Sequence, residues 1–407
     1  MCYNRDEFLD TALLESYPAK EGRTLNFCQN CSHSLELILN LGDQPLCNAF
    51  LNSTEEFETE KFYPLRLAYC KNCSLTQLTD VLPRELVFGK DFNYLSSSSK
   101  SVVEYYQYLA EKFIRMFRPT SVLEIASNDG VFLQPFKKQG IKVLGVEPAP
   151  KPAQIAIDQD IPTRVEYFED CYQDIDITPD IICAFDVLAH CERLDSFLFG
   201  ITQLMKQETV LILQCQSLDA MLESVAFDTA YHEHLRYFDV TSLKNLLSKY
   251  NLRVVDVEFT DFYGGSFLSY CRLGDVPSKY TTSPLTEKKL FQFAKLSQEL
   301  RNNISITVES RKEQGPVIGI GAPMKSSTLL NYCNLKLEYL TEVNQLKIGT
   351  FSPGMHIPVV DENKVDFGKE TTALVLSWNM YERIVSNLRQ KGFKGQFIVP
   401  IPVMEIL

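Results

Sequence analysis

Two pairs of cysteines have the clearest chemical spacing in this sequence. Cys28 and Cys31 form one CxxC pair, and Cys70 and Cys73 form the other. A tight turn points both sulfurs of such a pair at one metal ion, and two pairs complete the four-thiolate tetrahedron that zinc prefers. Because four sulfurs leave no position for water, the sequence predicts a structural zinc site. The alternatives are a redox-active pair, which usually opens a helix after a strand and occurs singly, and coincidence.

A second feature is the loop that follows a predicted strand at residues 121–125. Its residues read Ala-Ser-Asn-Asp-Gly, and such a loop lets the backbone approach a ligand at the N-terminus of the next helix. The next predicted strand ends at Glu147, where a carboxylate can accept hydrogen bonds from both hydroxyls of a ribose. Glu124, on the first strand, is close enough to steer a methionine ammonium group indirectly.

The composition of this loop favours S-adenosylmethionine over a nicotinamide cofactor. The loop lacks the three glycines of a dinucleotide fingerprint, and Ala126 stands where a glycine would normally be. S-adenosylmethionine carries no pyrophosphate and does not need that fingerprint. The alternative is an ordinary turn with two surface acids. The predicted cofactor-binding residues are Glu124, Ala126, Ser127, Asn128, Asp129, Gly130 and Glu147.

The histidines form a third feature, because the chain has only five in 407 residues. His232 and His234 stand two residues apart, and His190 lies just past a predicted strand at residues 181–186. The carboxyl end of such a strand faces the substrate in open α/β sheets. A histidine base suits proton abstraction beside a carbonyl, since its pKa lies near working pH. The alternatives are structural hydrogen bonding and a second metal site, although adjacent residues rarely face one ion.

The elements that must position these residues fall into four regions. Residues 1–25 form an N-terminal extension, 26–85 a zinc-binding module with a strand at 62–69, 86–260 a methyltransferase domain, and 261–407 a C-terminal α/β domain. Apolar runs separated by helix-length stretches predict a mainly parallel sheet in the third region, with strands at residues 121–125, 142–147, 181–186 and 209–214. With the cofactor loop, this pattern predicts a Rossmann-like class I methyltransferase fold.

The C-terminal region predicts a second α/β sheet. A helical pattern over about residues 287–314 leads into strands at residues 316–321, 372–377 and 395–400. Two open α/β sheets joined by a long helix leave a cleft between them, which is a usual place for a ligand.

Composition excludes several classes of function. The net charge of −12 and the pI of about 5.1 argue against a nucleic-acid partner. No segment reaches the roughly 18 apolar residues that cross a bilayer, and residues 1–10 lack the apolar core of a signal peptide. We therefore expect a cytoplasmic protein without a membrane partner, whose eight other cysteines are buried thiols.

Taken in order, these features resemble the sugar C-methyltransferases of deoxysugar biosynthesis, which methylate a nucleotide-linked 4-keto sugar at C3. The resemblance covers residues 26–402. It is carried by the cysteine pairs flanking residues 41–46, the cofactor loop, the strand-end stretch 186–190, residues 231–238, and the C-terminal stretches 264–266, 321–325, 328–331 and 352–358.

The resemblance implies roles for particular residues. His234 would remove the C3 proton of the acceptor. Four further residues would orient this base, the sugar or the enolate, or lie near the acceptor: Tyr231, Glu233, His190 and Tyr94. Lys325 and His356 would contact the pyrophosphate or the sugar. The alternatives for these two are a solvated lysine and a loop histidine.

The sequence departs from the family at Ala126, at Ser326-Ser327, and at residues 267–269, where an arginine is usual. The last two affect the acceptor side, so they bear on the substrate more than on the reaction. The competing functions are an O- or N-methyltransferase, a non-catalytic nucleotide-sugar-binding protein, and a zinc-dependent nucleic-acid binder, which the charge disfavours. We expect a nucleotide-linked keto-sugar as partner and a monomer or small homo-oligomer.

Overall fold

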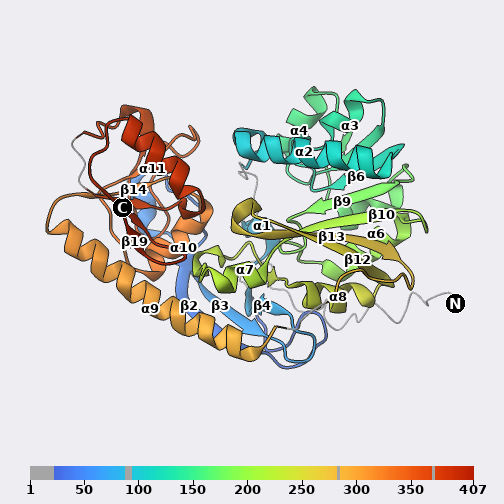
Figure 1. Cartoon of the computed structure of the whole chain (residues 1–407), viewed down its shortest axis with the longest axis horizontal. Helices are drawn as coiled ribbons and strands as arrows, with labels where there is room; N and C mark the ends of the chain where they lie inside the picture. The colour runs from blue at the N-terminus through green and yellow to red at the C-terminus, as the bar shows by residue number, and fades with distance from the viewer. Residues whose placement is uncertain (1–22, 88–93, 282–284, 369–371) are drawn as a thin grey trace.

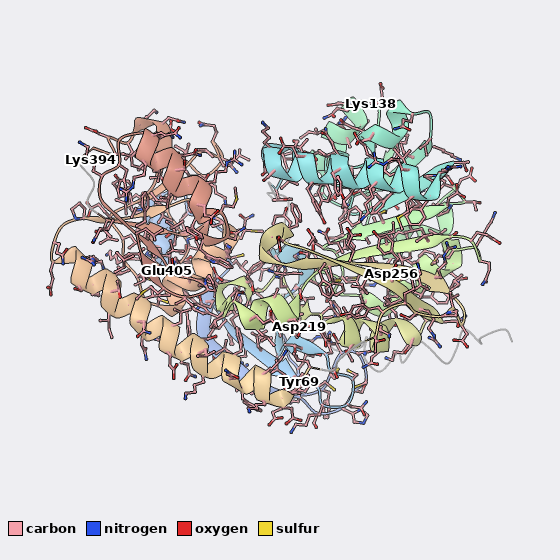
Figure 2. All side chains as sticks on the ribbon, in the orientation of Figure 1. Tyr69, Lys138, Asp219, Asp256, Lys394 and Glu405 are labelled. Carbon is pink, nitrogen blue, oxygen red and sulfur yellow. The ribbon has the colours of Figure 1, made fainter. Side chains whose placement is uncertain are left out.

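The computed structural model describes residues 23–87, 94–281, 285–368 and 372–407. Most of the predicted N-terminal extension therefore lies outside the described residues. Figure 1 shows the central sheet and its helices on the right, the C-terminal domain on the left, and a smaller sheet between and below them. Exposed charged side chains such as Lys138 and Lys394 lie at the periphery (Figure 2). Among the described residues, no helix is long and apolar enough to span a membrane.

The central sheet has seven strands in the order β12-β13-β10-β9-β6-β7-β8. All neighbours are parallel except around β13, which runs antiparallel to both β10 and β12. The strands are β6 (Ser121–Ile125), β7 (Lys142–Val146), β8 (Thr163–Arg164), β9 (Ile181–Phe185), β10 (Val210–Gln216), β12 (Leu252–Thr260) and β13 (Ser266–Leu273). The predicted Rossmann-like, mainly parallel sheet is confirmed.

Helices cover the central sheet. Figure 1 places α2, α3 and α4 above it and α8 below. Their apolar faces fill the core on both sides of the sheet, where Phe113 and Leu243 are fully buried. The helices are α2 (Lys100–Phe117), α3 (Gln134–Lys138), α4 (Pro150–Asp158), α5 (Phe168–Cys171), α6 (Leu194–Leu204), α7 (Leu218–Glu223) and α8 (Val240–Ser248).

The central sheet continues beyond residue 260, where we expected the domain to end. β13 begins at Ser266 and pairs with β10 over Leu211–Gln216 as well as with β12. The sequence pattern missed this continuation because β13 follows β12 as a hairpin strand. No crossover helix precedes it, although it lies between β12 and β10 in the sheet. The boundary with the C-terminal domain therefore falls after Leu273.

A four-stranded antiparallel sheet carries the cysteine pairs, in the order β11-β4-β3-β2. Three strands come from the predicted zinc module: β2 (Glu36–Pro45), β3 (Phe62–Tyr69) and β4 (Thr76–Leu78). The fourth, β11 (Arg236–Tyr237), comes from the histidine segment of the methyltransferase region and pairs with β4. Short pieces flank the module: β1 (Arg23–Thr24), β5 (Asp80–Val81) and α1 (Arg84–Val87).

The C-terminal domain has a second open sheet, in the order β16-β15-β14-β17-β18-β19. The first five strands are parallel, and only β19 is antiparallel. Helix α9 (Glu287–Lys312) runs along the lower edge in Figure 1 and joins this domain to the zinc module. The other elements are β14 (Val317–Ile320), α10 (Met324–Tyr332), β15 (Leu340–Glu342), β16 (Val359–Asp361), β17 (Thr372–Val375), α11 (Tyr381–Gln390), β18 (Gln396–Val399) and β19 (Glu405–Ile406).

Candidate active site

The cofactor loop leaves β6 in a tight left-handed turn. Ala126, Asn128 and Gly130 have φ angles of 58°, 48° and 78°. The amides of Ala126 and Ser127 both donate to the carbonyl of Val146, at 2.7 and 3.2 Å, which ties the loop to the end of β7. The left-handed conformation explains why a glycine is the usual residue at position 126, because an L-residue adopts it at a cost of about 1–2 kcal/mol.

Glu147 stands where the sequence predicts it, at the end of β7 beside this loop. Its two carboxylate oxygens accept hydrogen bonds from the amides of Asn128, at 2.9 Å, and Ala149, at 2.8 Å. Burial raises the pKa of Glu147 to about 7, although these two hydrogen bonds lower it in part. The carboxylate is thereby fixed in one orientation, suited to accepting hydrogen bonds from a ribose.

Glu124 and Asp129 are buried carboxylates with unused hydrogen-bonding capacity. Glu124 is 5% exposed and Asp129 is fully buried, yet Glu124 Oε2 and Asp129 Oδ1 have no hydrogen-bond partner. Burial, followed by the nearby carboxyls of Glu147 and Asp129, raises the pKa of Glu124 well above its ordinary value. An unsatisfied buried acceptor is costly, so these atoms fit a ligand that brings a positive charge and N–H donors. The ammonium group of S-adenosylmethionine has both.

Tyr94 lies in a segment that closes over the cofactor loop. The amides of Ser96 and Ser97 donate to Asn128 Oδ1 at 2.8 Å and to Asp129 Oδ2 at 3.0 Å. Asn128 Nδ2 in turn donates to the carbonyl of Tyr94 at 3.1 Å. The hydroxyl of Tyr94 lies 2.6 Å from that of Tyr263. Sequence reasoning missed Tyr263, although the two glycines that follow it, with φ angles of 88° and 122°, signalled an unusual turn.

His234 and His190 are held side by side by the backbone. His234 Nδ1 lies 3.2 Å from the carbonyl of Thr229, and His190 Nδ1 lies 2.7 Å from that of Glu233. A carbonyl only accepts, so we assign the ring proton of each histidine to Nδ1 and a lone pair to Nε2. The hydroxyl of Tyr231 lies 2.9 Å from Nε2 of His234, and the two imidazole centroids are 4.8 Å apart.

Both imidazoles are uncharged near neutral pH. Burial, followed by the neighbouring His190, lowers the pKa of His234 well below its ordinary value. Burial also lowers the pKa of His190 to about 4. A buried neutral histidine with its Nε2 lone pair available is in the protonation state that a general base needs.

The side chains of His232 and Glu233 make contacts away from His234. His232 Nε2 lies 3.3 Å from the carbonyl of Pro64 on β3, which is a structural contact with the zinc module. Glu233 Oε1 accepts a hydrogen bond from the thiol of Cys47 at 3.4 Å. These side chains therefore do not converge on one ion. Within the described residues, the only grouping with metal-ligand geometry is that of the four cysteines.

Lys325 lies at the carboxyl end of β14, as the first turn of α10 begins. Its ammonium sits 3.7 Å from the centroid of the Trp378 ring and donates to Asn379 Oδ1 at 2.7 Å. Burial lowers the pKa of Lys325 to about 8, against the opposing charge of Asp228. Trp378 Nε1 donates to Asp228 Oδ2 at 2.7 Å, and Asp228 immediately precedes the backbone that holds His234. Sequence reasoning missed Trp378 and Asp228.

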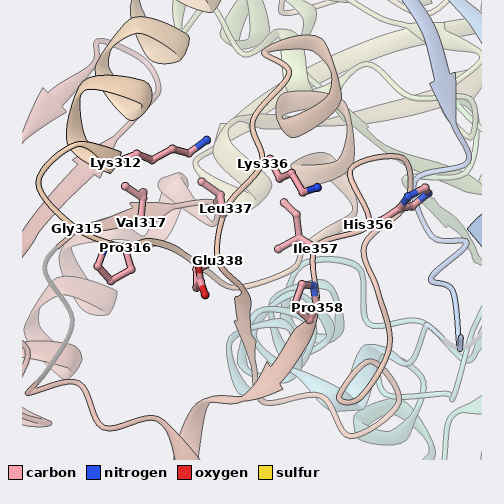
Figure 3. A pocket seen from close by; sticks show the side chains of 10 residues that line it. All are labelled: Lys312, Gly315, Pro316, Val317, Lys336, Leu337, Glu338, His356, Ile357 and Pro358. Carbon is pink, nitrogen blue, oxygen red and sulfur yellow. The ribbon is translucent and has the colours of Figure 1, made fainter. Parts of the chain in front are cut away.

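His356 lies at the opposite end of the same sheet. It lines an open cavity of about 690 Å³ at the amino ends of the parallel strands, together with Lys312 and Lys336 (Figure 3). Its Nε2 donates to Glu60 Oε2 at 2.7 Å, and its ring stacks on Phe57 with centroids 3.9 Å apart. The structure therefore does not bring His356 together with Lys325. It places His356 at the contact between the zinc module and the C-terminal domain.

The four cysteine sulfurs form a compact cluster. All lie within 4.8 Å of one another, with Cys28 Sγ 3.5 Å from Cys73 Sγ and Cys31 Sγ 3.4 Å from Cys70 Sγ. This spacing fits a tetrahedral ion with Zn–S bonds of about 2.3 Å. The side chain of His33 is exposed, and its Nδ1 lies 3.0 Å from the carbonyl of Cys31.

The two cysteine turns have the same geometry. In each, the amide four residues after the first cysteine donates back to the carbonyl of that cysteine: Ser32 to Cys28 at 2.9 Å and Ser74 to Cys70 at 2.8 Å. Both serines adopt left-handed φ angles, 57° and 64°. Asn245 on α8 donates to the carbonyl of Cys73 at 3.1 Å, which docks the zinc site against the methyltransferase domain.

Comparisons with known proteins agree with this architecture. Three known domains match successive parts of the chain: a zinc binding domain over residues 28–88, a methyltransferase domain over 100–257, and a C-methyltransferase C-terminal domain over 281–402. The C-methyltransferase NovU of Streptomyces niveus is 27% identical over 414 residues, which cover 95% of this chain and 97% of NovU. The chain has the three-domain organisation of an S-adenosylmethionine-dependent C-methyltransferase. The resemblance seen in the sequence is thereby confirmed.

The matched domains identify the cofactors of this C-methyltransferase. The methyl donor is S-adenosylmethionine, and the unpartnered carboxylate oxygens of the predicted cofactor loop have the chemistry to bind its ammonium group. The metal is zinc, and the cysteine cluster fits it. Both cofactor predictions are confirmed.

Solved structures align with less than half of this chain. A protein of Pyrococcus horikoshii OT3 is 15% identical, with a TM-score of 0.36, over 44% of this chain and 94% of its own. The magnesium protoporphyrin IX methyltransferase of Synechocystis PCC 6803 is 14% identical, with a TM-score of 0.33, over 46% of this chain and 88% of its own.

Replacing Glu233 with glutamine is expected to change how the stability of this C-methyltransferase depends on pH. Burial raises the pKa of Glu233 to about 7 in the folded state. The stabilising effect of the bound proton is complete below about pH 4.5 and is lost as the pH rises through 7. The free energy of unfolding of wild type should therefore fall by about 2–3 kcal/mol from this group between pH 5 and 8. Urea titrations at several pH values measure this.

The Glu233→Gln variant should lack that part of the decline. A matched control is Glu85→Gln, which changes an exposed carboxyl and should follow wild type. Parallel curves for Glu233→Gln and wild type would rule out a buried, proton-holding Glu233.

Breaking the contact between Glu60 and His356 is expected to weaken the packing of the zinc module against the C-terminal domain. Glu60 also accepts from the amide of Gly354 at 2.9 Å, so its carboxylate holds the turn before β16 at two points. Glu60→Ala should lower the free energy of unfolding by about 1–3 kcal/mol. Urea unfolding measures the loss, with Lys336→Ala as a control on the same cavity. Equal stability of the two variants would contradict the assigned contact.

Proposed function

We propose that this C-methyltransferase transfers the methyl group of S-adenosylmethionine to C3 of a nucleotide-linked 4-keto-deoxysugar, with His234 as the base. The observation that carries the proposal is the buried, neutral imidazole of His234, whose Nε2 bonds the Tyr231 hydroxyl at 2.9 Å. A carbon acceptor needs such a base, because its C–H bond must be broken before carbon can attack. The keto-sugar itself is inferred from the family resemblance.

In the proposed step, His234 Nε2 takes the C3 proton, and the electron pair of the C–H bond becomes an enolate delocalised onto the 4-keto oxygen. When bound, the donor supplies an electrophilic methyl group on a sulfonium, and the new carbon–carbon bond forms as the carbon–sulfur bond breaks. The Nδ1–H bond to the carbonyl of Thr229 keeps the His234 lone pair on Nε2 throughout.

Tyr231 stabilises the enolate in this proposal. Its hydroxyl bonds Nε2 of His234 and is released when the substrate C–H takes that place. The same hydroxyl then donates to the 4-keto oxygen as negative charge develops there, as oxyanion donors do. Burial raises the pKa of Tyr231 well above its ordinary value, which keeps the hydroxyl protonated as a donor.

The nucleotide end of the acceptor is assigned to the carboxyl edge of the C-terminal sheet. That edge carries Lys325 and Trp378, and ligands of open α/β sheets bind at this edge. Thr328 on α10 donates to the carbonyl of Ala230 at 2.7 Å, so the edge abuts the histidine segment. A nucleotide-sugar held by both domains spans this contact.

The test is a mass-spectrometric assay with S-adenosylmethionine and a panel of nucleotide-4-keto-deoxysugars in deuterated water. The proposal expects one added methyl on carbon and exchange of the C3 hydrogen that depends on His234. Methylation on oxygen or nitrogen without C–H exchange would instead support the hypothesis of an O- or N-methyltransferase. Cofactor binding without transfer to any of these sugars would exclude them as acceptors.

A further inference from the structure

Four carboxylates gather at the carboxyl ends of adjacent strands of the central sheet without a partner of opposite charge. Glu124 and Asp129 belong to the cofactor loop after β6, Glu147 ends β7, and Asp186 follows β9. Among the residues that the structure describes, none of the four forms an ion pair with a lysine or arginine. Uncompensated carboxylates in a buried site favour a cationic ligand. S-adenosylmethionine carries two cationic groups, an ammonium and a sulfonium.

The four carboxylates have different surroundings. Glu124 and Asp129 offer unpartnered oxygens inside the loop, and both oxygens of Glu147 face backbone amides. Asp186 stands apart from them, one strand over, with a left-handed φ of 55° that turns the chain sharply as β9 ends. Gln214 Nε2 donates to Asp186 Oδ2 at 2.6 Å and fixes its carboxylate.

Aromatic residues lie beside Asp186. Phe185, which precedes it, packs on Tyr106, and Gln214 links its carboxylate to the hydroxyl of Tyr105. After burial, the Asp186 carboxyl also contributes to the raised pKa values of Tyr94 and Tyr263. The rings form a continuous wall. Phe262 stacks on Tyr105 at 3.8 Å between centroids, and Phe185 stacks on Tyr106 at 5.7 Å.

The support behind this wall is a hydrogen-bonded chain. The Tyr105 hydroxyl donates to Gln214 Oε1 at 2.6 Å, and Gln214 donates to Asp186. Tyr94 is anchored to the cofactor loop through Asn128, and its hydroxyl meets that of Tyr263 at 2.6 Å. A carboxylate and several aromatic rings at one point match the chemistry that recognises a trialkyl cation.

We propose that Asp186 and the tyrosine wall, with Tyr263 as its outer member, form the subsite that recognises the sulfonium charge of S-adenosylmethionine. The ammonium belongs to the unpartnered oxygens of Glu124 and Asp129. The subsite distinguishes the charged donor from the neutral product S-adenosylhomocysteine. Transfer of the methyl removes the charge, so the product leaves a carboxylate without its counter-charge and is released more readily.

The experiment is isothermal titration calorimetry of S-adenosylmethionine and S-adenosylhomocysteine with wild type and Asp186→Asn. The two ligands share every group except the charged methyl. We expect Asp186→Asn to lower the ratio of affinities, donor over product, by about tenfold or more, while product affinity changes less than about threefold. Tyr263→Leu should lower the ratio in the same direction. Sinefungin, in which a carbon bearing a protonated amine replaces the methylated sulfonium, should follow the donor.

Glu147→Gln is the matched control, because a ribose contact should weaken the donor and the product equally. An unchanged ratio in Asp186→Asn would overturn the proposal. If Asp186→Asn binds neither ligand, Tyr263→Leu decides: a lowered ratio supports the subsite and an unchanged one overturns it. No sugar acceptor enters the experiment, so its failure leaves the proposed function standing.

Discussion

Replacing His234 with alanine is expected to lower turnover about 10²–10⁴-fold, the usual cost of losing a general base. The Nε2 atom bonded to Tyr231 is the only group of that side chain assigned to the chemistry. Affinity for S-adenosylmethionine should stay within a few-fold of wild type, because the cofactor loop is built from other strands. Exchange of the acceptor C3 hydrogen with deuterated water should be lost to the same extent as methylation.

The segment offers its own control. His232 is the same residue type two positions earlier, and it points to the carbonyl of Pro64 on the zinc module. His232→Ala should cost stability but leave turnover per folded molecule within a few-fold. A His234→Ala enzyme that retained turnover, or a His232→Ala enzyme that lost it equally, would remove His234 from its assigned role.

Removing zinc is expected to lower activity more than tenfold, because the fold of the histidine segment depends on the zinc module. Cys73 precedes β4 by three residues, and β4 pairs with β11, which begins two residues after His234. Leu78 also donates to the carbonyl of Leu235 at 2.9 Å. Structural zinc sites contribute about 10–16 kcal/mol in zinc-finger peptides, so a module without metal should not keep its sheet. Cys70→Ala or a chelator should therefore reduce methyl transfer more than tenfold.

Hydrogen exchange distinguishes local unfolding of the zinc module and the histidine segment from unfolding of the whole protein. The amides of β11 and β4 should lose protection when zinc is removed, while those of β6 and β9 in the central sheet keep it. His33→Ala, which changes an exposed residue beside the cluster, should leave one zinc bound and activity intact. Full activity of metal-free protein would show that β11 does not depend on the metal.

Some features of this enzyme follow from local sequence alone. The two CxxC pairs determine the metal site because zinc ligation needs only sulfurs at the right spacing on tight turns. Strand β3 occupies the predicted residues 62–69, and β6 the predicted 121–125, because apolar runs between turn residues have few alternatives. The cofactor loop and Glu147 were also predicted, since strand ends at one edge of a parallel sheet meet there.

Other features depend on contacts between distant residues. Nothing local in residues 231–234 determines that His232 turns to the zinc module while His234 bonds Tyr231. That division arises because β11 joins the four-stranded sheet. The pairing of Tyr263 with Tyr94 joins residues 169 positions apart, beyond any sequence period.

The sequence by itself determined the domain types, the metal ligands and the position of the predicted cofactor loop, because these depend on short-range spacing and strand order. Only the tertiary structure decided which side chains meet. It joined Asp228 to Trp378, placed Cys47 against Glu233, and separated His356 from Lys325. The physical reason is that such contacts are set by how three domains pack, and packing is a property of whole surfaces rather than of any one segment.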